Sequence, residues 1–229
     1  MKLRKIFNLI RKPHKISAKI KKRKLLKNID SLVHVGANRG QERKLYAKYN
    51  LEVLWIEPIE EVFEQLLANT KQYKKQKAIQ ALITDIDDKE YSFNIANNNG
   101  ASSSILDLKE HKEIWPHVHF ERTISLKSLT LSSLYKRENI KPEKYQALIM
   151  DTQGSEILVL KGGMPLLKHF EFIMTEVADF ESYKDCCQLA DMNEFMTNAG
   201  FEEHSRSQFG KPTKEGGRYF NIIYTRINR

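Results

Sequence analysis

Short apolar runs alternate with amphipathic stretches from residue 30 onward, and this alternation predicts strands and helices in turn. The predicted strands of a main sheet are residues 31–35, 52–56, 78–83, 147–150, 172–177, 201–204 and 219–226. The predicted helices are residues 41–49, 60–69, 127–138, 155–169 and 189–199. An extra strand at 90–95 leads into a polar stretch, residues 97–104, that has neither periodicity. Because the connections are short, we expect one α/β domain with a mostly parallel sheet of about seven strands, helices on both faces and a closing antiparallel pair.

Residues 1–27 differ from the rest of the chain in charge. They hold twelve Lys or Arg and no acidic residue, whereas residues 28–229 hold 26 basic and 29 acidic residues. The net charge of +9 therefore belongs to a basic N-terminal arm on a mildly acidic domain, residues 28–229. Apolar residues in the arm have helical spacing that is interrupted near Pro13. The arm is expected either to pack on the domain or stay solvated, or to contact an anionic membrane surface.

Composition narrows the class of protein. The chain is 41% hydrophobic and 29% charged, as is usual for soluble globular proteins. No apolar run approaches the roughly 20 residues that span a bilayer, so no transmembrane segment is predicted. The adjacent Cys186 and Cys187 disfavour a mutual disulfide and lack a metal-ligand pattern, which favours a cytoplasmic location, with the inner membrane surface as the alternative. Because the domain itself is not basic, nucleic acid is not the expected partner.

The first predicted strand ends in the loop Val35-Gly36-Ala37-Asn38-Arg39-Gly40. A glycine between strand and helix lets a ligand approach the backbone closely. Asn38 stands where dinucleotide-binding loops have their middle glycine, which suits a ligand without a pyrophosphate. Glu57 follows Gly36 by 21 residues, the spacing at which an acid accepts hydrogen bonds from ribose hydroxyls. A plain tight turn and a helix-capping acid are the alternatives, but the two features together predict an adenosine-type ligand.

Further motifs extend this pattern along the chain. They are Val-Gly-Ala-Asn-x-Gly at 35–40, Glu57-Pro58, Asn98-Asn99-Gly100-Ala101-Ser102-Ser103-Ser104 and Asp151-Thr152-Gln153-Gly154-Ser155-Glu156. Together they resemble the FkbM-type S-adenosylmethionine-dependent methyltransferases over about residues 30–205. The resemblance implies a Rossmann-like class I methyltransferase fold with S-adenosyl-L-methionine as cofactor. It also implies a hydroxyl acceptor, often on a sugar or a glycosylated natural product.

The resemblance also implies which residues bind the cofactor. Its methionine part would be bound by Gly36, Ala37, Asn38 and Gly40, its ribose by Glu57, and its adenine flanked by Ala81 and Leu82. Many members have Asp two residues before the first loop glycine, where this chain has His34. Glu42 is a nearby carboxylate that could take the place of that Asp, although acids are common at helix starts.

Candidate catalytic residues follow strands that should be neighbours in the sheet. Asp151 ends the very apolar strand 147–150, and Glu176 lies near the end of the next strand. Transfer of a methyl group to an alcohol needs an aligned acceptor oxygen and a group that takes its proton. Either acid could be the base, an orienting group or the partner of the cofactor's ammonium, and helix capping is the alternative for both.

The acceptor side is expected from residues 98–119. His111 is a candidate base because it follows the polar segment, whose Ser103 and Ser104 are candidate substrate-binding residues. Trp115 could form a flat wall for a sugar ring or anchor the loop. His117 and His119 lie nearby, but without acidic ligands at fixed spacing they predict no metal site.

These observations leave three hypotheses for function. The first is O-methylation of a small-molecule or glycan acceptor. The second is an RNA or protein methyltransferase that the basic arm guides to its substrate. The third is a degenerate cofactor-binding module that acts through interactions, for which His34 is the supporting feature.

Overall fold

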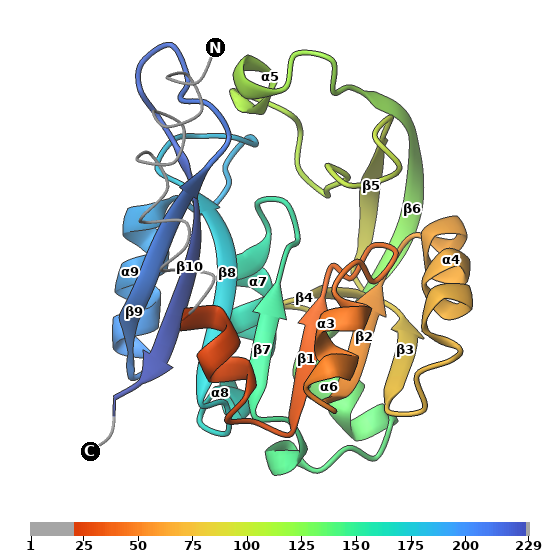
Figure 1. The fold of residues 1–229 in the computed structure, drawn as a ribbon. Coiled ribbons are helices and arrows are strands. Elements are labelled where there is room, and N and C mark those ends of the chain that lie inside the picture. The colour runs from red at the N-terminus through yellow and green to blue at the C-terminus, as the bar shows by residue number, and fades with distance from the viewer. Residues whose placement is uncertain (1–20, 228–229) are drawn as a thin grey trace, which may run out of the picture.

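The computed structural model describes residues 21–227 and contains two sheets (Figure 1). The larger sheet has seven strands in the order β3-β2-β1-β7-β8-β10-β9. Their bounds are β3 Gln76–Gln80, β2 Glu52–Glu57, β1 Ser31–Val35, β7 Ala147–Met150, β8 Phe172–Ala178, β10 Tyr219–Arg226 and β9 Phe201–Phe209. The first five are parallel, and β10 runs antiparallel to both β8 and β9. The predicted Rossmann-like sheet with its closing antiparallel pair is confirmed.

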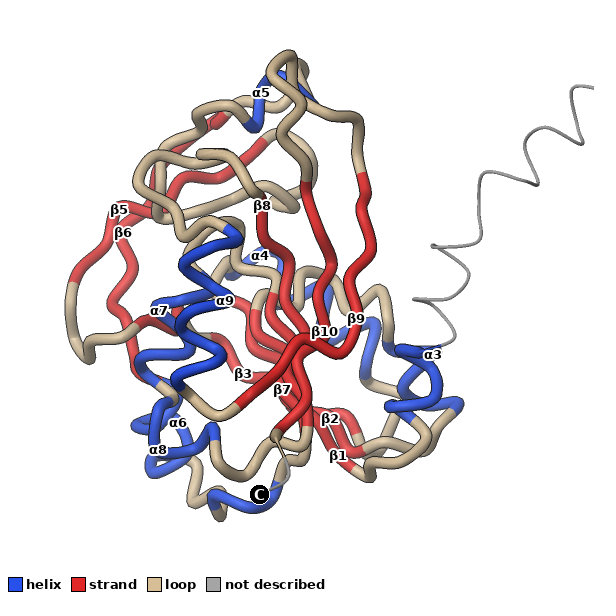
Figure 2. Tube along the Cα trace, turned by 90° about the vertical axis from the view of Figure 1, so that its left-hand side faces the viewer, coloured by secondary structure: helices blue, strands red, loops and turns tan. Residues whose placement is uncertain are grey.

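The central strands are apolar throughout because the sheet is covered on both faces. Every residue of β1 and β7 is buried, as expected for parallel strands between two helical layers. One face packs against α6, α7, α8 and α9, and the other against α3, α4 and the helical residues 21–26 (Figures 1 and 2). The bounds are α3 Arg43–Lys48, α4 Glu60–Thr70, α6 Leu131–Arg137, α7 Glu156–Gly162, α8 Met164–Leu167 and α9 Leu189–Asn198.

A second sheet adjoins the first, and its strand over residues 90–96 lies beyond the carboxyl ends of β1 and β2 (Figure 1). It has three strands in the order β4-β6-β5, namely β4 Leu82–Thr84, β6 Phe120–Thr130 and β5 Glu90–Ala96. The prediction of one strand over 78–83 was therefore wrong. The chain leaves the main sheet at Ala81, and Leu82 to Thr84 pair with Ser128 to Thr130 instead.

The predicted helix over 127–138 begins too early. Residues through Thr130 belong to β6, which pairs with β4 on one side and β5 on the other. The helix α6 starts at Leu131, where the hydroxyl of Thr130 accepts a hydrogen bond from the backbone N–H of Ser133 at 3.0 Å. Because β4 and β5 pair with it, β6 continues to Thr130, the residue that caps α6.

Other boundaries differ by shorter amounts. The predicted helix 155–169 is divided at Gly163 into α7 and α8, and 41–49 shortens to α3. The strand predicted at 201–204 continues to Phe209. Two short helices were not predicted, α5 (His111–Ile114) and the 3-10 helix η1 (Pro142–Lys144). The latter precedes β7.

The described end of the basic arm is part of the domain. Residues 21–26 are helical, and Leu26 is completely buried against Leu32, Tyr46 and other residues of the second core cluster. The expected boundary at residue 27 therefore falls after a segment that already packs on the sheet. The predictions made for residues 1–20, membrane contact included, lie outside the described residues. Over residues 21–227, no helix is long and apolar enough to cross a membrane.

Candidate functional site

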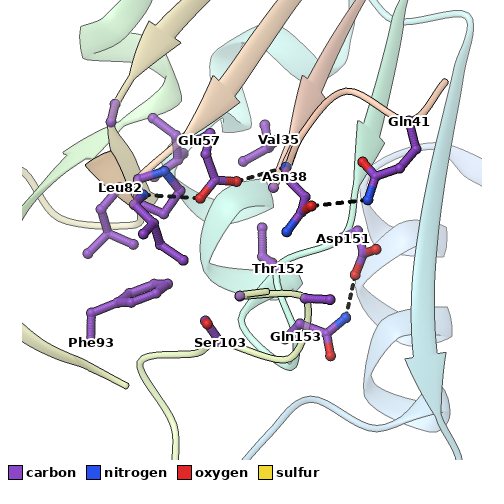
Figure 3. A pocket seen from close by; sticks show the side chains of 17 residues that line it. Val35, Asn38, Gln41, Glu57, Leu82, Phe93, Ser103, Asp151, Thr152 and Gln153 are labelled. Carbon is purple, nitrogen blue, oxygen red and sulfur yellow. Dashed lines mark hydrogen bonds between the residues drawn. The ribbon is translucent and has the colours of Figure 1, made fainter. Parts of the chain in front are cut away.

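A cleft lies where β1, β2 and β7 end and the second sheet begins (Figure 3). We call it the cofactor cleft. Its walls come from five parts of the chain: the loop after β1, the end of β2, the residues that lead into β4, the strand β5 with the loop after it, and the loop after β7. It is lined by Val35, Gly36, Asn38, Gln41, Glu57, Pro58, Ile59, Ala81, Leu82, Ile83, Phe93, Gly100, Ala101, Ser103, Asp151, Thr152 and Gln153.

The loop after β1 has a conformation that requires glycine. Gly36 has a φ of +76°, and a Cβ atom there would lie 1.9 Å from the carbonyl oxygen of Asp151. The loops after β1 and β7 can touch only because this position has no side chain. Asn38, at φ +44°, then turns its backbone N–H toward Glu57.

Glu57 occupies the middle of the cleft and is 4% exposed. Its two carboxylate oxygens accept hydrogen bonds from the backbone N–H groups of Asn38 at 2.8 Å and Ile59 at 3.0 Å. Each oxygen can accept a further hydrogen bond. Burial raises the pKa of Glu57 to about 7 although both N–H groups oppose this. The side chain is thus held with spare acceptor capacity at the position where a ribose was expected.

The cleft changes in character from one end to the other (Figure 3). Leu82 and Phe93 form an apolar end, and Asp151 with Gln41 forms a polar end. The hydroxyl of Thr152 is buried in this wall without a hydrogen-bond partner among the described residues. An apolar end for a base, a central carboxylate for a ribose and a polar end for an amino acid fit S-adenosylmethionine.

The loop after β7 fixes the Asp151 carboxylate through Gln153. The Gln153 side-chain nitrogen donates to Asp151 Oδ1 at 2.5 Å, and its oxygen accepts from the hydroxyl of Tyr183 at 2.8 Å. Burial raises the pKa of Asp151 to about 6, while the Gln153 hydrogen bond opposes this shift. Gln153 was quoted in the motif but given no role, and the partner Tyr183 carries no sequence signal that could have identified it.

Glu156 shapes the same loop from below. Its carboxylate accepts hydrogen bonds from the backbone N–H groups of Thr152 at 2.8 Å and Gly154 at 3.0 Å. It is 3% exposed, and burial raises its pKa to about 7. Glu156, the last residue of the Asp-x-Gln-Gly-x-Glu motif, therefore fixes the loop that carries Asp151, the first residue of the motif.

A second cavity adjoins the cofactor cleft and shares Ala101 and Gln153 with it. We call it the aromatic pocket. It has a volume of about 150 Å³ and is lined by Asn98, Ala101, Ser102, His111, Trp115, His117, Val118, Gln153, Glu176, Phe209 and Tyr219. The ring of Trp115 lies 4.6 Å from that of His111 and 5.1 Å from that of Tyr219, between centroids. The predicted substrate residue Trp115 thus forms a wall of this pocket.

His111 is fixed in place by two hydrogen bonds. Its Nδ1 lies 2.7 Å from the hydroxyl of Tyr219, and its Nε2 lies 3.2 Å from the hydroxyl of Ser102. The side chain is buried, and burial lowers its pKa to about 4. A neutral imidazole with both nitrogens engaged is better suited to shaping the pocket than to taking a proton.

Glu176 brings a carboxylate to the aromatic pocket from β8. Its pKa is raised by burial and by the nearby carboxylates of Asp151 and Glu156. The two acids predicted at neighbouring strand ends therefore face the same region. Asp151 does so from the cofactor cleft and Glu176 from the aromatic pocket.

Several predicted residues are placed differently from the expectation. Ala37 is 2% exposed in the core, and Gly40 packs toward Leu66, so neither lines the cofactor cleft. Ser103 lines the cofactor cleft and accepts a hydrogen bond from Ala96 at 2.9 Å, rather than facing the acceptor side. Ser104 is completely buried and donates to the backbone oxygen of Gln153 at 2.8 Å. The serine of this segment that lines the aromatic pocket is Ser102.

His34 belongs to the core under the helices. Its ring stacks on Trp55 at 5.0 Å between centroids, and its Nδ1 lies 3.2 Å from the hydroxyl of Tyr46. Burial lowers its pKa to about 4, so the imidazole is neutral. Over residues 21–227, no group of three metal-ligating side chains is arranged to hold an ion.

The sequence is similar to those of known methyltransferases. The model of the methyltransferase FkbM domain matches residues 34–203. The 2-O-methyltransferase NoeI of Sinorhizobium fredii is 26% identical over 194 residues, which cover 80% of this chain and 78% of NoeI.

Two solved structures share the fold. The methyltransferase domain of METTL16 has a TM-score of 0.52 at 12% identity, covering 94% of this chain and 69% of that one. Sp1610 of Streptococcus pneumoniae, assigned as a tRNA (m1A22) methyltransferase, has a TM-score of 0.50 at 11% identity, covering 91% and 71%.

Proposed function

The chain belongs to the FkbM methyltransferase family, and from that premise we propose that it methylates a hydroxyl group of a sugar, glycan or glycosylated small molecule. Family membership makes it an S-adenosylmethionine-dependent methyltransferase. The acceptor class is our inference. It is supported by the name of the 2-O-methyltransferase NoeI and, more directly, by the aromatic pocket.

The aromatic pocket carries the proposal. Trp115 and Tyr219 offer flat faces that suit the C–H surface of a sugar ring, and Glu176 offers a carboxylate that accepts hydrogen bonds from hydroxyls. The pocket shares Gln153 with the cofactor cleft. A ring bound there would present a hydroxyl toward Asp151.

In the proposed arrangement, residues of the cofactor cleft bind S-adenosylmethionine, which supplies an electrophilic methyl group on a sulfonium. Glu57 accepts from the ribose hydroxyls, Leu82 and Phe93 contact the adenine, and Asn38 with Gln41 lies toward the amino acid part.

In this proposal, Asp151 is the base that accepts the proton of the acceptor hydroxyl. Its pKa of about 6 leaves it mostly ionised at neutral pH yet more basic than an exposed carboxylate. Gln153 orients its carboxylate. Glu176 and Trp115 position the acceptor.

The experiment is methyl transfer from labelled S-adenosylmethionine into separated glycan, glycosylated small-molecule, lipid, RNA and protein fractions. We expect label in a hydroxyl of the glycan or glycosylated fraction, at a rate that Asp151→Asn lowers by about a hundredfold or more. Label confined to RNA or protein would support the second hypothesis instead. Tight cofactor binding without transfer into any fraction would support the degenerate module.

A further inference from the structure

A third cavity, with a volume of about 390 Å³, lies beside the aromatic pocket. It is bounded by residues 21–26, by α3 and by one face of β8, β10 and β9, and we call it the Lys22 groove. On the opposite face these strands pack against α9. On the groove face, β9 presents the small hydroxyls of Ser205 and Ser207, and β10 presents Asn221. A sheet face that packs against a helix carries large apolar side chains, which fill the space between the two. The small polar side chains at these positions leave that space open.

The groove borders the proposed acceptor site. Phe209 lines both the groove and the aromatic pocket. Asn221 of the groove is the register partner of Glu176 of the aromatic pocket, on adjacent strands β10 and β8. A molecule bound in the aromatic pocket would reach the groove by passing Phe209.

The charges of the groove select a kind of ligand. Lys22 and Arg23 face it, together with one carboxylate, Glu42. Across the part of the chain that the structure describes, neither Lys22 nor Arg23 has an ion pair or a side-chain hydrogen bond. Lys22 is partly buried, and burial lowers its pKa while Glu42, Glu176 and Asp151 favour the charged form. Lys22 is thus a partly desolvated cation without an ion pair among the described residues, beside the exposed Arg23, and such a pair favours an oxyanion ligand. The hydroxyls and the amide of the groove favour a saccharide.

We propose that the Lys22 groove binds the remainder of an acceptor saccharide that carries a phosphate or carboxylate group, and that Lys22 and Arg23 recognise this oxyanion. The inference rests on the proposed function, since it takes the aromatic pocket as the place of the methylated unit. It gives the end of the basic arm a part in selecting the acceptor.

The test is calorimetric titration of the full chain, saturated with S-adenosylhomocysteine, with three probes: maltose, maltose 1-phosphate and digalacturonate. We expect at least one anionic probe to bind about tenfold or more tightly than maltose, as a charge-assisted hydrogen bond allows. Preference for the phosphate or for the carboxylate identifies the source of the oxyanion. Equal affinities for all three probes, or no binding of any, overturn the inference.

Two variants test whether the preference for an anionic probe comes from the Lys22 groove. Lys22→Gln should lose it, while Lys24→Gln, an exposed lysine of the same helix outside the groove, should keep it. Equal effects of the two substitutions overturn the assignment.

If Lys22→Gln fails to fold, Ser207→Phe fills the groove from β9 and should weaken binding of the anionic probe while leaving the affinity for S-adenosylhomocysteine unchanged. Unchanged binding of the probe then overturns the inference. Failure of the wild-type protein to bind S-adenosylhomocysteine would instead show that the proposed function is wrong.

Discussion

The side-chain nitrogen of Gln153 lies 2.5 Å from a carboxylate oxygen of Asp151. The other end of the same amide accepts from Tyr183, so Gln153 has one orientation and holds Asp151 in one orientation. The amide also forms the boundary between the cofactor cleft and the aromatic pocket. The Gln153 side chain thus binds Asp151, which is proposed to take the proton, and lines both cavities.

Replacing Gln153 with Leu should lower kcat about tenfold and shift the pH dependence. The hydrogen bond from Gln153 opposes the raised pKa of Asp151, so its loss should raise that pKa further. The acidic limb of the rate profile should move to higher pH. Tyr183→Phe keeps the Gln153 donor and should move the limb less, and identical profiles in both variants and the wild type would contradict the role of Gln153.

Asp151→Asn should reduce turnover by about 10²–10⁴ while the melting temperature barely changes. Asparagine keeps the shape and removes the charge and the basicity. In the wild type, the rate should rise with pH up to about 6 and then level off, because protonated Asp151 cannot accept a proton. Rate recovery at saturating cofactor would show that Asp151 holds the cofactor's ammonium instead, and near-normal turnover would remove it from the catalytic residues.

Glu57→Ala should weaken S-adenosylmethionine binding tenfold or more, measured by calorimetry. The loss of charged hydrogen bonds to the ribose corresponds to roughly 1.5–3 kcal/mol. Alanine also leaves the N–H groups of Asn38 and Ile59 without their acceptor, and Glu57→Gln supplies an acceptor oxygen to only one of them, so the melting temperature of each variant is the control for folding. Unchanged affinity in folded Glu57→Ala protein would contradict the ribose assignment.

The contribution of Glu57 to the stability of the protein without cofactor should decrease as the pH rises from about 4.5 to 7, whereas the lowered pKa values of His34 and His111 act in the opposite direction up to about pH 6.5. The pKa of Glu57 is raised from 4.5 to about 7, so between these values the folded state binds more protons than the unfolded state, and stability decreases with rising pH. A shift of this size corresponds to roughly 3 kcal/mol. The melting temperature of the wild type, measured relative to that of Glu57→Gln, should therefore fall across this range. A difference that stays constant would show that Glu57 does not titrate in this window.

Two truncations separate the roles of the arm. If residues 1–20 attach the enzyme to an anionic membrane surface, deleting them should abolish binding to anionic liposomes and leave turnover of a soluble acceptor intact. Deleting residues 1–27 also removes Leu26, whose side chain is completely buried, and should lower the free energy of unfolding by about 2–5 kcal/mol. If the wild-type protein does not bind anionic liposomes, or if salt does not weaken that binding, the membrane proposal is contradicted.

The sequence by itself determined the central strands of the main sheet and one end of the site. The central strands β1 and β7 are buried on both faces, so they are apolar throughout and can be recognised locally. Gly36 and Asp151 follow β1 and β7, Glu57 is the last residue of β2, and parallel strands bring their carboxyl ends to one edge of the sheet. The position of the cofactor cleft therefore follows from the order of motifs along the chain.

The tertiary structure alone decided the second sheet and the acceptor side. Residues 120–130 alternate weakly, and they become a strand because β4 and β5 pair with them. The aromatic pocket joins His111 and Trp115 to Tyr219, which lies on β10 more than 100 residues away. Hydrophobic periodicity reports how a segment is buried, but not which distant segment buries it. For the same reason, the sequence identified Gln153 within a motif but could not show that Tyr183 orients it against Asp151.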